Sequence, residues 1–373
     1  MTLEMSSDGV HLQPECPLAA QWFADRMRLP DGAPATINGD ATDVESALAR
    51  AADLLRRARR PLLHGFDGAT VEDARAAIAL ADRLGALVST SSPTGVWPGA
   101  PAVPLRGAST ATLGEIRDRS QVVVIWREDP ESTHPRLLDR LGFDDARDRT
   151  LVVVDDRGTA TAQRAGLGLS WPPEHDLEAL TSLHVLQRGL AIGPSELSAE
   201  LSGLLERLRA VPHAAFVYGP GLTAGAGGQR RALALHELVR ALCHERHVVT
   251  LELPHAAGTR GADDVLAWQT GYGGAVDLAG GHPELVTATQ PLDDVDVSLL
   301  VEPGPTAAAQ IALGGPGAGP DVDVWIRTGA PGVAASGTMH RLDGVPLTLQ
   351  SPAPDDAPTA AALLARLLAE TDA

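Results

Sequence analysis

Charged side chains that could bind a phosphorylated ligand follow two apolar segments of the chain, at residues 122–126 and 151–154. Arginine forms paired hydrogen bonds with phosphate oxygens, and an acidic residue at a strand end can bind a nucleotide's ribose or base. The candidates are Arg127, His134 and Arg136 after the first segment, and Asp155, Asp156 and Arg157 after the second. Turn chemistry explains the aspartates equally well, and the arginines also fit a solvated or interface loop.

Two further groups of residues suggest chemistry less strongly. The glycine-rich segment at 218–228 lies between an expected strand and an expected helix, but its spacing departs from the dinucleotide-binding pattern, which favours a plain turn. His236, Cys243, His244 and His247 lie on or just after one helix, yet no carboxylate or distant cysteine completes a metal site. Neither a Ser-His-Asp order nor a Gly-x-Ser-x-Gly elbow is evident.

Alternating apolar strands and amphipathic helices must position these groups, which is the pattern of a parallel α/β sheet covered on both faces. Thr42 or Asp43 should cap the first helix, the Thr70-x-x-Asp73 start should cap the second, and Gly85 should lie near its end. We expect strands at 61–66, 87–92, 121–126, 149–156, 214–222, 247–253, 296–304 and 322–329, and helices at 41–60, 70–86, 134–142, 179–190, 196–211, 228–246 and 358–371.

The order of these elements predicts two doubly wound, Rossmann-like α/β domains. We place an irregular lead-in at residues 1–40, a first domain at 41–175, a helical connection at 176–204 and a second domain at 205–373. The Gly/Pro segment at 314–321 should be a surface connection, because an apolar strand and not a helix follows it.

Composition narrows the classes of function. The formal net charge of −18 disfavours nucleic acids and anionic membranes as partners. All 30 basic residues are arginine, so there is neither a P-loop lysine nor a lysine for a Schiff base. The two cysteines, Cys16 and Cys243, lie far apart and support no disulfide framework. No membrane-spanning run and no signal peptide is evident, so we expect a cytoplasmic protein.

Three segments, in this order and spacing, resemble the B subunit of formylmethanofuran dehydrogenase, a member of the molybdopterin oxidoreductase superfamily. They are TLGEIRDRSQVVVIW followed by DPESTHPR (112–136), WQTGYGGAVDLAGGHPE (268–284) and GVAASGTMHRLDGVPL (332–347). VVVDDRGTATA (152–162) also fits the nucleotide region of that family. The resemblance implies two domains of molybdopterin-oxidoreductase type, with the six strand-end residues in the groove for a pterin nucleotide.

The departures from the family pattern concern its cofactors. Family dehydrogenases hold an N-terminal iron–sulfur cluster on four cysteines, and here only Cys16 resembles one of them. The cysteine that binds tungsten or molybdenum should lie in a Cys-His-Gly stretch, but residues 92–105 contain neither cysteine nor histidine. The active-site arginine region reads Pro254-His255-Ala256. We therefore expect the pterin, the metal and the cluster to be lost, no cofactor in this chain, and a vestigial groove.

This pattern is similar to the reduced B subunit of the bacterial formyltransferase/hydrolase complex. The resemblance implies a non-catalytic structural subunit that assembles with the A, C and D subunits. The complex would move formyl from formyl-tetrahydromethanopterin to a methanofuran-type carrier and release formate, with zinc and the carrier on the partners. The alternative is a working molybdo- or tungstopterin dehydrogenase subunit. Residues 56–92 also resemble the middle domain of thiamine-diphosphate enzymes, but their Gly-Asp-Gly…Asn-Asn metal motif is absent.

Overall fold

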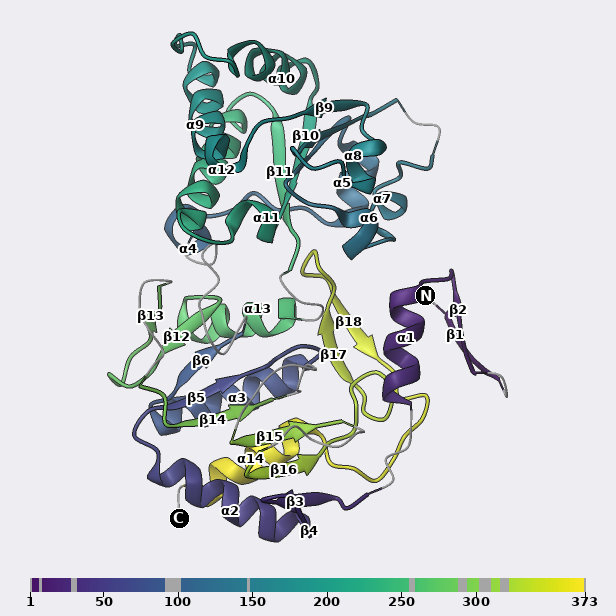
Figure 1. Ribbon diagram of the computed structural model, residues 1–373, viewed down its shortest axis with the longest axis vertical. Helices are drawn as coiled ribbons and strands as arrows, with labels where there is room; N and C mark the ends of the chain where they lie inside the picture. The colour runs from purple at the N-terminus through teal and green to yellow at the C-terminus, as the bar shows by residue number, and fades with distance from the viewer. Residues whose placement is uncertain are drawn as a thin grey trace. The chain divides into compact units, whose positions relative to one another are not determined.

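The structure is a computed structural model that describes residues 2–6, 9–27, 32–90, 102–145, 148–254, 259–287, 294–301, 310–315 and 322–371. The chain divides into two compact units (Figure 1). Unit 1 combines Met1–Trp97 with Ala256–Ala373, and unit 2 is the continuous segment Pro98–His255.

Unit 2 contains a five-stranded parallel sheet with the strand order β11-β10-β7-β8-β9. Alternate residues of β7 face opposite sides of the sheet, and all five are buried because helices cover both faces. The strands are β7 (Val122–Trp126), β8 (Thr150–Val154), β9 (Leu167–Leu169), β10 (His213–Tyr218) and β11 (His247–Glu252).

Helices α9 (Asp176–Gln187), α10 (Ser198–Ala210) and α12 (Gly228–Leu242) pack on one face of this sheet. They form a single core with Trp126 and Phe216 of the central strands. The remaining helices of unit 2 are short: α4 (Ala102–Arg106), α5 (Leu113–Arg119), α6 (Pro130–Thr133), α7 (Leu137–Arg140), α8 (Ala160–Gln163), the 3₁₀ turn η1 (Pro173–His175) and α11 (Pro220–Thr223).

Unit 1 contains a nine-stranded sheet with the order β13-β12-β6-β5-β14-β15-β16-β3-β4. Its central strands are parallel, and antiparallel strands extend both edges. The strands are β3 (Ala35–Ile37), β4 (Asp40–Thr42), β5 (Pro61–His64), β6 (Leu87–Ser89), β12 (Ala275–Asp277), β13 (Glu284–Leu285), β14 (Val297–Leu300), β15 (Ile311–Gly314) and β16 (Val324–Arg327).

Four helices share one hydrophobic core with the nine-stranded sheet: α2 (Val44–Arg57), α3 (Val71–Leu84), α13 (Thr259–Thr270) and α14 (Ala360–Thr371). Their ends follow the local sequence signals. The Asp43 side chain caps α2, Thr70 and Asp73 form the expected capping box of α3, and Gly85 ends α3 in the left-handed conformation. Two hairpins complete the unit, β1 (Thr2–Ser6) with β2 (Gly9–Gln13), and β17 (Gly337–His340) with β18 (Pro346–Leu349); helix α1 (Pro17–Arg26) follows the first.

The α/β class with parallel sheets is confirmed, but the chain does not divide as we expected. Strands β5 and β6 pair with β14 and β12 from the C-terminal half, so one unit is built from both ends of the chain. The proposed domains 41–175 and 205–373 each mix strands of both sheets. Hydrophobic patterning identifies strands but carries no information on which strands pair, and this is the reason for the difference.

Smaller differences concern the ends of the chain and one helix. The lead-in 1–40 contains a hairpin, a helix and strand β3, so it is more regular than expected. The helix expected at 134–142 is one turn, α7, preceded by the short α6. Most of 92–105 and of 314–321, together with residues 255–256, lies outside the described residues, so the metal-ligand and surface-loop predictions there stay untested.

Candidate functional site

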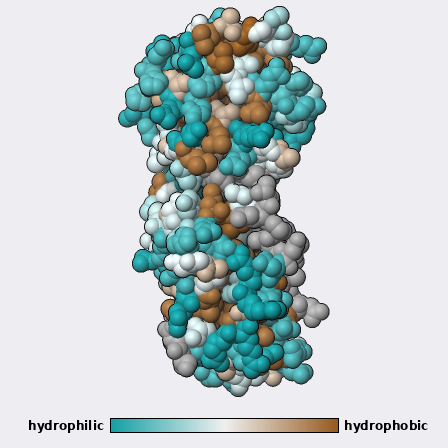
Figure 2. Space-filling model, turned by 90° about the vertical axis from the view of Figure 1, so that its left-hand side faces the viewer, coloured by the Kyte–Doolittle hydropathy of each residue, from teal (hydrophilic) through white to brown (hydrophobic). Residues whose placement is uncertain are grey.

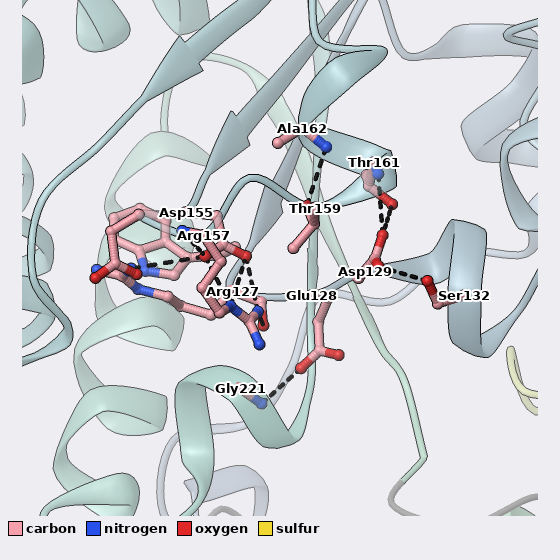
Figure 3. Close-up of polar contacts among 12 residues, drawn as sticks. Arg127, Glu128, Asp129, Ser132, Asp155, Arg157, Thr159, Thr161, Ala162 and Gly221 are labelled. Atoms are coloured by element: carbon pink, nitrogen blue, oxygen red, sulfur yellow. Dashed lines mark hydrogen bonds and ion pairs between the residues drawn. The ribbon is translucent and has the colours of Figure 1, made fainter.

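The carboxyl ends of β7 and β10 lie side by side in the middle of the unit 2 sheet. After β7 the chain continues to β8 on one side, whereas after β10 it continues to β11 on the other side. Such a reversal of strand order is where ligands bind in open α/β sheets. The residues that line this point are therefore the candidate site (Figure 3).

Arg127, the first residue after β7, is buried, and its guanidinium group binds internal acceptors. Its Nε lies 3.0 Å from Oδ2 of Asp176, and its Nη1 lies 2.7 Å from Oδ1 of Asp156. Its Nη2 donates to the backbone oxygen of Trp171 at 2.6 Å and to Oδ1 of Asp176 at 3.1 Å. Every nitrogen of the guanidinium group therefore has a protein partner.

The carboxylate of Asp176, at the start of α9, is the second centre of this network. Besides Arg127, it accepts hydrogen bonds from the indole Nε1 atoms of Trp126 and Trp171, each at 3.0 Å. The two indole rings contact each other edge to face, with centroids 5.7 Å apart. Asp176 is 1% exposed, so this buried charge is fully paired as burial requires.

Asp155 and Arg157 form a second pair at the end of β8. Nη2 of Arg157 lies 2.7 Å from Oδ2 of Asp155, and its backbone N–H also donates to Asp155 at 2.9 Å. The hydrogen bond to Asp155 raises the pKa of Arg157 above its usual value. Arg157 also donates to the backbone oxygen of Arg127 at 3.0 Å, which joins the two pairs.

Asp129 connects the loop after β7 with the start of α8. It accepts hydrogen bonds from the backbone and hydroxyl of Thr161 at 2.9 and 2.6 Å, and from the hydroxyl of Ser132 at 2.6 Å. Burial raises the pKa of Asp129, but these hydrogen bonds outweigh that effect and the net pKa is lowered. Asp129 therefore fixes the shape of this loop.

Glu128 is a residue that sequence reasoning missed. Its side chain points to the loop after β10, where its carboxylate accepts a hydrogen bond from the backbone N–H of Gly221 at 2.6 Å. Burial raises its pKa to about 7, although Gly221 and Arg157 act in the opposite direction. The signal that could have identified it is a charged residue just beyond the end of a fully buried strand.

The backbones of the two loops approach each other too closely for any side chain at Gly221. A Cβ atom there would lie 1.8 Å from the backbone oxygen of Arg127. At Gly219 a Cβ atom would lie 2.9 Å from a carboxylate oxygen of Glu128. Glycine at 219 and 221 is thus required by close packing at the strand ends.

His134 and Arg136 have other contacts. Arg136 forms an ion pair with Asp139 of α7 at 2.9 Å, and Nδ1 of His134 lies 3.0 Å from the hydroxyl of Thr133. Burial lowers the pKa of His134. Of the six residues proposed for a groove, the structure brings Arg127, Asp155, Asp156 and Arg157 into one network, while these two bind locally.

The glycine-rich loop at 218–228 presents carbonyl oxygens to a side chain. Arg231 of α12 donates to the backbone oxygens of Leu222, Ala224 and Ala226 at 2.6, 2.7 and 3.0 Å. A phosphate cradle would instead direct backbone N–H groups inward. The loop therefore agrees better with the interpretation as a strand-to-helix turn.

The residues weighed as a metal site do not converge. His236 contacts the hydroxyl of Tyr218 at 3.1 Å, and burial lowers its pKa to about 4. The thiol of Cys243 donates to the backbone oxygen of Val248, and His247 stacks on His213. Within the described ranges, no three His, Cys, Asp or Glu side chains are placed to hold a metal ion.

The charge balance of the strand-end network tests whether a pterin nucleotide fits it. The network contains two arginines and five carboxylates, namely Arg127, Arg157, Glu128, Asp129, Asp155, Asp156 and Asp176. Both guanidinium groups are bound to carboxylates. The network as a whole carries a net negative charge. Binding a pyrophosphate needs cationic donors that are not already paired with carboxylates. This charge balance disfavours an anionic ligand at these residues.

Comparisons with known proteins support the resemblance. No protein-family model matches the chain. It is 28% identical to the B subunit of tungsten-containing formylmethanofuran dehydrogenase 2 of Methanocaldococcus jannaschii, over 83% of this chain and 78% of that one. It is 29% identical to the B subunit of the formyltransferase/hydrolase complex Fhc of Methylorubrum extorquens, over 82% of this chain and 87% of that one.

Solved structures agree with these relatives. The crystal structure of the formyltransferase/hydrolase complex FhcABCD from Methylorubrum extorquens with methylofuran contains a chain that matches with a TM-score of 0.75 and 26% identity, over 91% of this chain and 98% of that one. Acetylene hydratase from Pelobacter acetylenicus matches with a TM-score of 0.57 at 10% identity, which shows a shared fold alone. By sequence and by structure, the chain is similar to the B subunits of formylmethanofuran dehydrogenase and of the formyltransferase/hydrolase complex.

Proposed function

We propose that this chain is the B subunit of a formyltransferase/hydrolase complex and acts as a structural subunit without its own active site. The observation that carries the proposal is the pairing of both strand-end arginines with internal carboxylates, where a cofactor-binding relative needs donors for phosphate. The complex transfers formyl from formyl-tetrahydromethanopterin to a methanofuran-type carrier and releases formate. Zinc and the carrier belong to the partner subunits.

Two features of the sequence support the loss of redox chemistry. Residues 92–105 contain no cysteine or histidine, so no thiolate is available there to bind tungsten or molybdenum. The sequence contains only two cysteines, Cys16 and Cys243, whereas a four-iron cluster is held by four thiolates. The matched chain of the FhcABCD structure is also covered almost completely, at 98% of its length.

The surface supports assembly with partner chains, for which we propose the A, C and D subunits. Helix α1 has no fully buried residue, and its Leu18 is 54% exposed, although the helix also contains Trp22 and Phe23. The face in Figure 2 is mostly hydrophilic, with small groups of exposed apolar residues. The exposed apolar side chains of α1 would gain stability if a partner covered them. No helix in the described part of the chain could span a membrane.

The alternative is a working dehydrogenase subunit, which the 28% identity to a tungsten-containing relative favours. Purification of the tagged chain from its native host distinguishes the two. We expect a hetero-oligomer that contains three further subunits, releases formate, and contains no stoichiometric tungsten, molybdenum or iron by elemental analysis. A chain that elutes alone, or that carries stoichiometric tungsten or a four-iron cluster, would contradict the proposal.

A further inference from the structure

The backbone of Arg127 adopts a left-handed conformation that is uncommon for residues with a long side chain. Its φ is 58°, in the left-handed region that glycine adopts without steric cost. Among the described residues other than glycine, Asn38 shares this region with a φ of 50°, and asparagine tolerates it better than arginine does. A long side chain at position 127 therefore needs a compensating interaction.

The compensating interaction is a pocket that surrounds the guanidinium group. The pocket is formed by the carboxylate of Asp176, the carboxylate of Asp156 and the backbone oxygen of Trp171. The Arg127 side chain is 2% exposed, whereas that of Asp156 is 37% exposed, so the pocket opens to solvent on the Asp156 side. All three groups are hydrogen-bond acceptors, and they receive a planar fork of N–H donors.

This pocket is built for such a fork. Oδ1 of Asp176 accepts hydrogen bonds from two indole N–H donors, which hold this oxygen in place independently of Arg127. It lies beside the strand ends where a nucleotide binds in this class of sheet. A carboxylate at such a position accepts two parallel N–H bonds from a guanidinium ion or from the N1–H and N2–H edge of guanine, which is itself a cyclic guanidine.

We propose that Arg127 is an internal ligand that fills a pocket selective for planar guanidine-type donors, and so closes the site to nucleotides. This inference rests on the proposed function and deepens it, because it gives the reason why the groove takes no cofactor. The same chemistry has two sources, a free guanidinium ion and a guanine base. Adenine cannot replace either, because its edge offers no matching pair of donors to a carboxylate.

The test uses the intact complex with Arg127→Gly, a substitution that relieves the positive φ and empties the pocket. We expect a lower melting temperature than that of the unchanged complex. Low-millimolar guanidinium chloride should raise it again, while potassium chloride at the same ionic strength should not. In calorimetric titration, guanosine should bind this variant at least about tenfold more tightly than adenosine, because adenosine leaves the carboxylate unpaired. The unchanged complex should bind neither nucleoside.

Two further variants keep the test decisive. Arg164→Ala removes a surface arginine of the same unit that pairs with Glu131 and Asp144, and its stability should not respond to guanidinium. If Arg127→Gly does not assemble, Arg127→Gln provides the same measurements with a shorter side chain that retains one donor group. The proposal is overturned if guanidinium rescues neither Arg127 variant, or if guanosine and adenosine bind them equally. Both readouts are independent of formate release and of metal content, so they can fail while the proposed function stands.

Discussion

Removing one member of the ion pair between Arg127 and Asp176 should destabilise the protein more than breaking any surface pair of unit 2. In Asp176→Asn the amide loses the negative charge and directs an N–H₂ group toward the guanidinium, which leaves a cation 3% exposed without its main partner. Removal of one member of a buried ion pair costs about 3–5 kcal/mol. For a unit of this size, each kcal/mol lowers the melting temperature by about 2–4 °C, so we expect a decrease of roughly 6–20 °C.

Urea unfolding of the complex measures the lost free energy of unfolding. Tryptophan fluorescence can follow it because Trp126 and Trp171 both donate hydrogen bonds to Asp176. Asp139→Asn is the matched control, since it breaks the exposed pair with Arg136 and should cost less than about 1 kcal/mol. The combined Arg127→Met and Asp176→Leu variant should lose less than the two single changes together, because no buried charge remains. An Asp176→Asn loss as small as that of the control would refute the assignment of a buried, energetically coupled pair.

Three further predictions concern single residues near the strand ends and in unit 1. Gly221→Ala should lower the free energy of unfolding by more than about 2 kcal/mol, because the added methyl group meets the Arg127 carbonyl. The control Gly203→Ala in α10 has open space around it and should be neutral or stabilising by about 1 kcal/mol. Urea unfolding measures both changes. Burial raises the pKa of Glu128 from 4.5 to about 7, so its contribution to stability is largest at low pH and declines as the pH rises from about 4.5 to 7. Glu128→Gln should flatten that part of the curve of unfolding free energy against pH. An unchanged curve would contradict the raised pKa. Burial lowers the pKa of His64 to about 4, so the protein should lose stability as the pH falls from 6.5 toward 4, and His64→Leu should lose measurably less over this range in thermal melts at stepped pH.

Features with local causes could be predicted from the sequence. The capping box of Thr70 and Asp73, the cap at Asp43 and the left-handed Gly85 all depend on residues within four positions of each other. Strand β7 is recognisable because five consecutive apolar residues need burial on both faces. The strand-end position of Arg127 follows in the same way, since the end of an apolar run marks the end of its strand.

The sequence could not predict the partners of those strand-end residues. Asp176 begins a helix 49 positions from Arg127, and Gly221 lies 93 positions from Glu128. The sequence does not reveal whether the guanidinium group of an arginine is free or paired. The phosphate-binding interpretation and the internal ion pair therefore could not be separated before the fold was known. The pairing depends on which loops meet at the reversal of strand order, and that is a property of the assembled sheet.

The division of the chain also depended on tertiary structure. The sequence by itself determined that the chain forms parallel α/β sheets and where most strands and helices lie, because these follow from apolar patterning and turn residues. Tertiary structure decided that β5 and β6 join strands from the C-terminal half, and that the two strand-end arginines face carboxylates. Strand pairing and charge pairing both arise from contacts between distant residues, and an apolar or charged side chain fits many such partners equally well until the sheet brings one of them close.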